Sequence, residues 1–170
     1  MRLSIKGCPE KKRFRPYVKR AALFYCDQLF SKKILESIHI QIIFNPSLEV
    51  YGFASIEGFN DNNKPREFLV ELNPDIGAAN ILKTLAHELV HVKQYVYGET
   101  NETLTRWKGA KIDPDKVNYW DHPWEIEANG LESSLLAKFV IQEKLWEVFS
   151  NLRDPDGPIQ KESLGFKEMA

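Results

Sequence analysis

The chain has 170 residues, of which 43% are hydrophobic and 28% are charged, and its formal net charge is -1. These values are typical of a soluble globular domain with a single core. Two cysteines, Cys8 and Cys26, exclude a disulfide framework and a four-cysteine metal site, and they indicate a reducing compartment. The sequence has no apolar run near the roughly 18 to 20 residues of a membrane span and no secretion signal at its start. We therefore expect a cytoplasmic protein, in the host cytoplasm if it is viral, without a membrane partner.

Charge is unevenly distributed along the chain. Residues 1–36 carry ten Lys or Arg against three acidic residues, whereas residues 121–170 carry five against ten. Such a split lets the two ends attract each other, leaves them solvated, or marks a surface for nucleic acid. The basic segment consists of Lys11, Lys12, Arg13, Arg15, Lys19 and Arg20. Few aromatic residues lie among these charges to stack on bases, so nucleic acid is the less favoured partner.

A helix is predicted first, from Pro16 to about Leu35, because apolar residues recur there every three or four positions. Strand-like segments follow at 38–44, 50–58 and 68–72. In these segments apolar and polar residues alternate, or aromatic and small residues are enriched. Turn signals separate them at Asn45-Pro46 and at residues 60–65. We expect a small antiparallel sheet of three or slightly more strands.

The second half of the chain is predicted to be mainly helical. A long helix runs from Ile76 to about Tyr97 and ends at a glycine. Residues 98–122 show no sustained periodicity, and irregular segments of that length are uncommon in a compact domain unless they have a function. The last long helix is predicted from Pro123 to about Leu152, with an exposed tail at 153–170. These elements predict one α+β domain over residues 1–152.

The second predicted helix contains His87-Glu88-Leu89-Val90-His91, which is the pattern H-E-x-x-H. A spacing of four places both imidazoles on one face of a helix, where they can bind one Zn²⁺. Glu88 between them can then act as general base toward metal-bound water. Apolar residues occupy the opposite side of the helical wheel. We therefore expect the helix to pack with one side and to present the histidines on the other.

A catalytic zinc site needs a third protein ligand. The extended metzincin pattern requires Gly and His at positions where this chain has Gln94 and Tyr97, which excludes that class. Two glutamates lie near the start of the last predicted helix. On the helical wheel Glu125 lies beside the apolar stripe, whereas Glu127 lies well outside it. Glu125 is therefore the better candidate, with His122 as an alternative.

Other polar and aromatic residues are candidates for supporting roles. Asn129 lies one helical turn after Glu125 and can hydrogen-bond a ligand histidine, which would fix its ring. Candidate donors to a developing oxyanion are Tyr119, His122, Tyr95 and Arg106, and their spacing does not choose among them. The aromatic residues of the irregular segment either wall a cleft or pack in the core. These are Trp107, Tyr119, Trp120 and Trp124.

The run Leu85–Val92, followed by Glu125–Asn129, resembles the zincin metallopeptidases of the gluzincin type. Small bacterial and phage proteins called SprT-like or ImmA-like are similar in their H-E-L-x-H-V-x-Q helix and later P-x-E-x-E-A segment. The resemblance implies a helix, a mixed or antiparallel sheet, a motif helix and a glutamate-bearing helix over roughly residues 16–150. Asn129 stands where gluzincins have Asp, and two distant cysteines cannot form the zinc ribbon of SprT proteins. The chemistry of zincins is therefore implied more strongly than the biology of SprT proteins.

From these residues we expect a zinc-dependent peptidase that acts on a peptide or protein, with His87, His91 and Glu125 as ligands and Glu88 as general base. The resemblance also implies that the second or third predicted strand pairs with extended substrate. One alternative is a non-catalytic zinc-stabilised binding or regulatory module, which would fill the fourth coordination position with protein. Another is a DNA-associated peptidase, whose DNA binding would weaken steeply with salt. The sequence does not specify the substrate or the oligomeric state.

Overall fold

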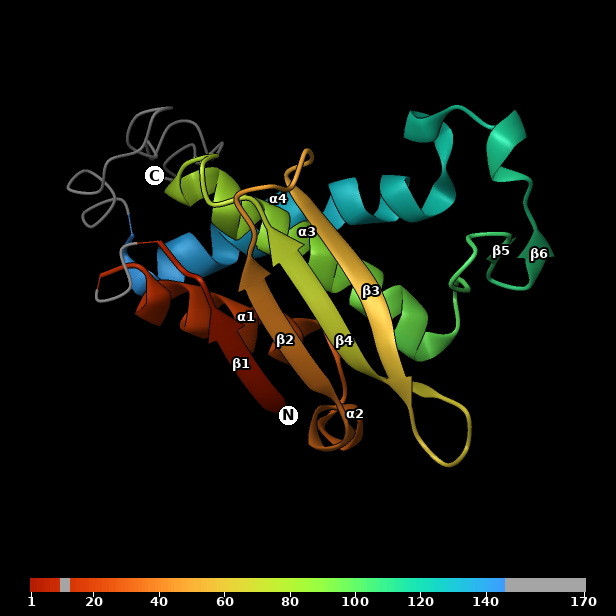
Figure 1. Ribbon diagram of the computed structural model, residues 1–170, viewed down its shortest axis with the longest axis horizontal. Coiled ribbons are helices and arrows are strands. Elements are labelled where there is room, and N and C mark those ends of the chain that lie inside the picture. Colours follow the sequence, from red (N-terminus) through yellow and green to blue (C-terminus); the bar gives the residue numbers. More distant parts are fainter. Residues whose placement is uncertain (10–12, 146–170) are drawn as a thin grey trace, which may run out of the picture.

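The computed structural model describes residues 1–9 and 13–145 (Figure 1). A mixed four-stranded sheet carries its helices on one face, which confirms the predicted α+β class. The predicted tail at 153–170 and the predicted domain end at residue 152 lie outside the described residues. In the described ranges, no helix combines the length and the apolar character that crossing a bilayer requires.

The sheet has the strand order β1-β2-β4-β3. Its strands are β1 (Arg2–Lys6), β2 (His39–Phe44), β3 (Gly52–Phe59) and β4 (Pro65–Leu72). β1 is parallel to β2 and β2 is parallel to β4, whereas β3 pairs antiparallel with β4. The expectation of an antiparallel sheet is therefore wrong: a helical crossover connects the parallel strands β1 and β2, and β3 lies outside β4 instead of between β2 and β4. β3 forms one edge of the sheet.

The predicted first helix is in fact two helices, α1 (Arg15–Leu29) and α2 (Lys32–Ser37). They are separated at Phe30, whose extended backbone (φ -124°, ψ 147°) ends α1. Together they connect β1 to β2. Because these strands are parallel, the chain needs such a long crossover connection between them. The N-terminal strand was not predicted because it is short and has only Leu3 and Ile5 as alternating apolar positions.

Two long helices follow the sheet strands. α3 (Ala78–Tyr97) agrees with the predicted second helix and ends at Gly98, whose φ of 67° favours glycine. α4 (Pro123–Glu143) begins at the predicted proline. It ends at Glu143 instead of continuing directly toward Leu152, because Lys144 adopts a left-handed conformation with φ of 52°. Residues from 146 onward lie outside the described ranges.

Short elements occupy the irregular segment between the two long helices. They are the strands β5 (Arg106–Trp107) and β6 (Ala110–Lys111) and the 3-10 helices η1 (Pro114–Lys116) and η2 (Tyr119–Asp121). β5 and β6 pair as a small antiparallel hairpin. This segment extends beyond the end of α3 and returns to the start of α4 (Figure 1). η2 packs against α4, which places it next to the predicted metal ligands.

α3 lies at the centre of the packing and contacts α1, α4, β3 and β4. Its predicted apolar face is buried, as expected, with Leu85 and Leu89 fully inaccessible. The polar side of the helix is also covered, since Thr84, Glu88 and Gln94 are buried. The histidine face is therefore enclosed by neighbouring elements and is less open than the helical wheel predicts.

Candidate metal centre

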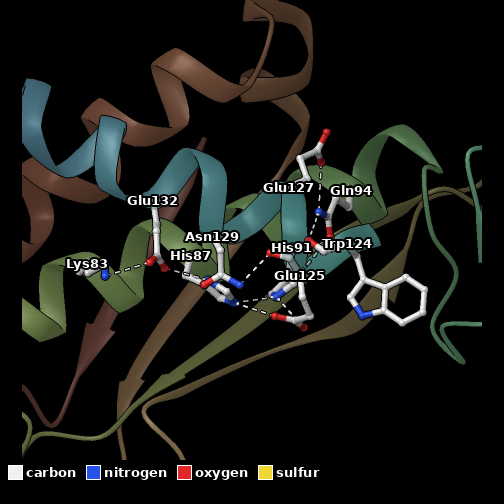
Figure 2. Close-up of polar contacts among 9 residues, drawn as sticks. All are labelled: Lys83, His87, His91, Gln94, Trp124, Glu125, Glu127, Asn129 and Glu132. Carbon is white, nitrogen blue, oxygen red and sulfur yellow. Dashed lines mark hydrogen bonds and ion pairs between the residues drawn. The ribbon is translucent and has the colours of Figure 1, made fainter. Parts of the chain in front are cut away.

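Three side chains meet between α3 and α4: His87 and His91 from α3, and Glu125 from α4 (Figure 2). Their ligand atoms all lie within 4.8 Å of one another. His87 Nε2 lies 3.1 Å from His91 Nε2 and 3.2 Å from Glu125 Oε2, and His91 Nε2 lies 3.5 Å from Glu125 Oε1. Within the described ranges, no other group of His, Cys, Asp or Glu forms such a cluster. The structure thus brings together the three residues that the sequence predicts as ligands.

The local sequence explains why these side chains meet. His87 and His91 lie one turn apart, so their rings stand side by side with centroids 4.7 Å apart. Pro123 in the first turn starts α4, and Glu125 follows within that turn. The helix N-terminus there favours a carboxylate. Glu125 is buried, so its charge must be balanced by the groups around it.

His91 is oriented by Gln94. The Gln94 Nε2 amide donates to the Trp124 carbonyl oxygen at 2.9 Å and to Glu127 Oε2 at 3.0 Å. Gln94 Oε1 lies 2.9 Å from His91 Nδ1 and must therefore accept a hydrogen bond from the N–H of that ring nitrogen. In a neutral ring, this leaves the lone pair of His91 Nε2 facing His87 and Glu125, as metal binding requires.

His87 contacts Glu132, a residue that the sequence did not single out. Glu132 Oε2 lies 2.9 Å from His87 Nδ1, and its Oε1 lies 3.0 Å from Lys83 Nζ (Figure 2). The prediction that Asn129 holds a ligand histidine is wrong. Asn129 Nδ2 donates instead to the backbone carbonyl of Glu125 at 2.8 Å, one turn earlier in the same helix. The missed signal was the spacing of seven from Glu125 to Glu132, which returns to the same helix face.

The ligand atoms of His87, His91 and Glu125 surround a position that favours a positive charge. Burial lowers the pKa of His87, but the carboxylates of Glu125 and Glu132 beside it raise this pKa to about 10. Burial lowers the pKa of His91, which favours its neutral form. Glu125 Oε2 is buried without a hydrogen bond of good geometry. The positive charge of protonated His87 therefore lies where a divalent cation would satisfy two imidazoles and one carboxylate, so the residues fit Zn²⁺.

Glu88 lies next to the cluster and is also buried. Burial raises the pKa of its carboxyl to about 8, with the charge of His87 opposing this shift. Gly52 of β3 packs directly against it: a Cβ at Gly52 would lie 2.8 Å from Glu88 Oε1 and 2.5 Å from Thr84 Cγ2. The absence of a side chain at Gly52 therefore allows β3 to approach the motif helix.

A cavity of about 270 Å³ opens onto these residues. Its lining includes His87, Glu88 and Glu125. It also includes Gly52 at the start of β3 and the two residues before it, Val50 and Tyr51. Tyr119 and Trp120 from η2 form another part of the lining, and both are more than half exposed. The cavity is therefore bordered by two of the three predicted metal ligands, His87 and Glu125, by the edge strand of the sheet and by exposed aromatic rings.

Among the candidate oxyanion donors, Tyr119 lines this cavity. The Glu125 carboxylate is near enough to influence the Tyr119 hydroxyl electrostatically. Burial and the charge of Glu125 raise the pKa of Tyr119 to about 12, so the hydroxyl keeps its proton at neutral pH. Tyr95 packs partly against the hydrophobic core, and Arg106 lies exposed on β5, so neither forms part of the cavity lining.

His122 lies outside the ligand cluster. Its Nε2 is 3.1 Å from the Pro114 carbonyl oxygen, and its ring stacks on Trp124 with centroids 4.6 Å apart. The ring is therefore part of the packing at the start of α4, and the structure places His122 outside both the ligand cluster and the cavity lining. Trp124 is buried and Trp107 packs against it edge-on, whereas Tyr119 and Trp120 lie at the cavity. The aromatic residues thus divide between packing and cavity wall.

Glu127 points away from the histidines, as the helical wheel predicts. Its carboxylate lies 3.1 Å from Lys93 Nζ and 3.1 Å from Lys108 Nζ. It also accepts the hydrogen bond from the Gln94 amide described above. Although burial raises its pKa, these partners hold the pKa of Glu127 below its usual value. Glu127 therefore anchors the β5–β6 hairpin to both long helices.

The described part of the basic segment lies on α1 and the residues before it. Arg20 Nε pairs with Glu143 Oε2 of α4 at 2.7 Å. Arg20 also lies over the Tyr17 ring, 4.5 Å from its centroid. This ion pair joins the basic and acidic regions of the chain, in line with mutual attraction of the two ends. Lys11 and Lys12 lie outside the described residues.

The chain was compared with protein-family models, with curated proteins and with solved structures, and it matches none of them. Any function must therefore be inferred from the geometry of the site itself.

Proposed function

We propose that this chain is a zinc-dependent peptidase in which His87, His91 and Glu125 hold Zn²⁺ and Glu88 is the general base. The convergence of three ligand side chains beside the buried Glu88 carries this proposal, and His87, Glu88 and Glu125 line one cavity. When bound, Zn²⁺ would supply a Lewis acid that polarises a peptide carbonyl and lowers the pKa of a coordinated water toward about 7.

The residues of the chain divide the remaining work among them. Glu88 accepts a proton from the attacking water and returns it to the leaving amine, so that the amide is hydrolysed without net change in the enzyme. Tyr119 in the same cavity donates a hydrogen bond to the carbonyl oxygen as that oxygen gains negative charge. Gln94 keeps the His91 imidazole aimed at the metal.

The edge strand β3 is the element that we propose binds the substrate backbone. β4 lies between β2 and β3, so its backbone groups already pair on both sides. β3 has β4 on one side and begins at the cavity with Gly52. An extended peptide that adds to β3 would bring a peptide bond past Glu88 and the metal ligands.

A non-catalytic zinc module is the main alternative. Structural zinc sites have four protein ligands, whereas catalytic sites have three and keep a position for water or substrate. Within the described ranges, three side chains form the cluster, and a cavity adjoins it. The buried acid Glu88 beside the ligands has a role in catalysis but none in structural coordination. These observations favour a peptidase.

The decisive variant is Glu88→Gln, with zinc content and cleavage of casein measured in parallel with the wild type. We expect zinc to be retained and cleavage to fall by about 10²- to 10⁴-fold, the usual contribution of a general base. Glu36→Gln, at an exposed position on α2, is the matched control and should cleave like the wild type. Equal cleavage by wild type and Glu88→Gln would overturn the mechanism. If the wild type binds zinc but cleaves neither casein nor any peptide of a random peptide library, the non-catalytic module would be supported instead.

A further inference from the structure

The two histidines of the motif are held by chemically different partners. His91 Nδ1 donates to the neutral amide oxygen of Gln94, whereas His87 Nδ1 faces the carboxylate of Glu132. A carboxylate can only accept at this contact, so the proton lies on His87 Nδ1. The Nε2 atom of His87 is then directed toward His91 and Glu125.

Glu132 is built into this position by its place on α4. Seven residues separate it from Glu125, which is two helical turns, so both carboxylates face α3. The side chain of Glu132 is 11% exposed, and each of its oxygens has one partner. Lys83 holds Oε1 at 3.0 Å, while Oε2 is 2.9 Å from His87. The ion pair with Lys83 stabilises the carboxylate in its charged, hydrogen-bond-accepting form.

We propose that Glu132 is the positioning residue for His87: its carboxylate sets the ring orientation and makes the imidazole a stronger metal ligand. This inference rests on the proposed zinc site. Asn129, one turn after Glu125, donates a hydrogen bond from its Nδ2 to the Glu125 backbone carbonyl, whereas Glu132 is the residue in contact with His87 Nδ1. Both histidine ligands are thereby tied to fixed partners before any metal arrives.

The test compares Glu132→Ala and Glu132→Gln with the wild type in competition for Zn²⁺ against a chromogenic chelator. Loss of the carboxylate should weaken zinc binding about 10- to 100-fold in Glu132→Ala. Glu132→Gln keeps an accepting oxygen and should restore part of that affinity. Glu143→Gln removes an acid from an ion pair on the same helix, away from the ligand cluster, and should bind zinc like the wild type.

A second measurement separates positioning from general stability. In the zinc-loaded, ¹⁵N-labelled protein, the hydrogen-bonded Nδ1 proton of His87 should give a slowly exchanging signal that disappears in Glu132→Ala. The His91 signal should remain, because Gln94 is unchanged. Equal zinc affinity and an unchanged His87 signal in Glu132→Ala would overturn the role of Glu132. A wild-type protein that binds no zinc would instead overturn the proposed function. If Glu132→Ala does not fold, the same two measurements are made on Glu132→Gln. Wild-type zinc affinity together with an unchanged His87 proton resonance in that variant would overturn the role of the Glu132 carboxylate.

Discussion

At Gly52 the backbone of β3 lies directly against two side chains of α3, Thr84 and Glu88. A Cβ there would lie 2.5 Å from Thr84 Cγ2 and 2.9 Å from Glu88 Cγ, closer than carbon atoms tolerate. We expect Gly52→Ala to displace β3 or the Glu88 side chain and to destabilise the fold by about 1–3 kcal/mol. Peptidase activity should fall more than zinc binding, because Glu88 is not a ligand. Urea unfolding, zinc titration and peptide cleavage measure these three effects.

Gly130 offers a matched control for this substitution. It lies on α4, and a Cβ built there meets no atom within 4 Å. Gly130→Ala should leave activity unchanged and stabilise the protein by about 0.5–1 kcal/mol, the gain expected from removing glycine from a helix interior. A Gly52→Ala protein as stable and as active as the wild type would show that β3 does not pack against Glu88 as described.

At the scale of single elements, α4 ends with a residue that is poorly suited to its backbone. Lys144 adopts φ of 52° and ψ of 42°, a left-handed conformation in which glycine has no Cβ penalty. We expect Lys144→Gly to raise the free energy of unfolding by about 1 kcal/mol, measured by urea denaturation. Lys138→Gly, within the same helix, should lower it by about 1 kcal/mol. Destabilisation by both changes would mean that the helix continues through Lys144.

The helices of the site could be predicted from the sequence because their signals are local. The spacing of His87 and His91 sets their geometry within one helix, whatever surrounds it. The same periodicity distinguishes Glu125 from Glu127, since the two side chains point in different directions. Glu132 could have been found by the same reasoning, at two turns from Glu125. Gln94 could not be assigned to His91, because its orientation depends on contacts with α4.

The strands show the limit of local signals. Alternation predicted β2 and β4, and enrichment in aromatic and small residues predicted β3, but the pairing of strands depends on the path of the chain between them. β2 and β4 are parallel neighbours although β3 lies between them in sequence. The cavity depends on this order, because it places β3 at the edge beside α3. The proposed metal ligands could thus be named from the sequence, whereas only the fold shows which strand borders the cavity beside them.

For the molecule as a whole, the proposed ligands join two helices that are distant in sequence. His87 and His91 belong to α3 and Glu125 to α4, with the irregular segment between them. A metal that needs all three ligands binds the folded chain and not the unfolded one, so it stabilises the fold by mass action. We expect Zn²⁺ at 100 times its Kd to raise the free energy of unfolding by about 2.7 kcal/mol, measured by urea denaturation with and without a chelator.

Two variants of α4 show whether this stabilisation comes from the proposed site. Glu125→Ala removes the ligand that α4 contributes, so zinc should no longer stabilise the fold at the same concentration. Glu127→Gln removes a carboxylate that pairs with Lys93 and Lys108, so it should lower the free energy of unfolding with or without metal. Zinc should still raise the free energy of unfolding of this variant by the same amount as in the wild type. The reverse pattern would place the metal at Glu127 and contradict the assignment of Glu125. Stabilisation by zinc that survives both substitutions would mean that the ion binds elsewhere and does not join α3 to α4 through this site.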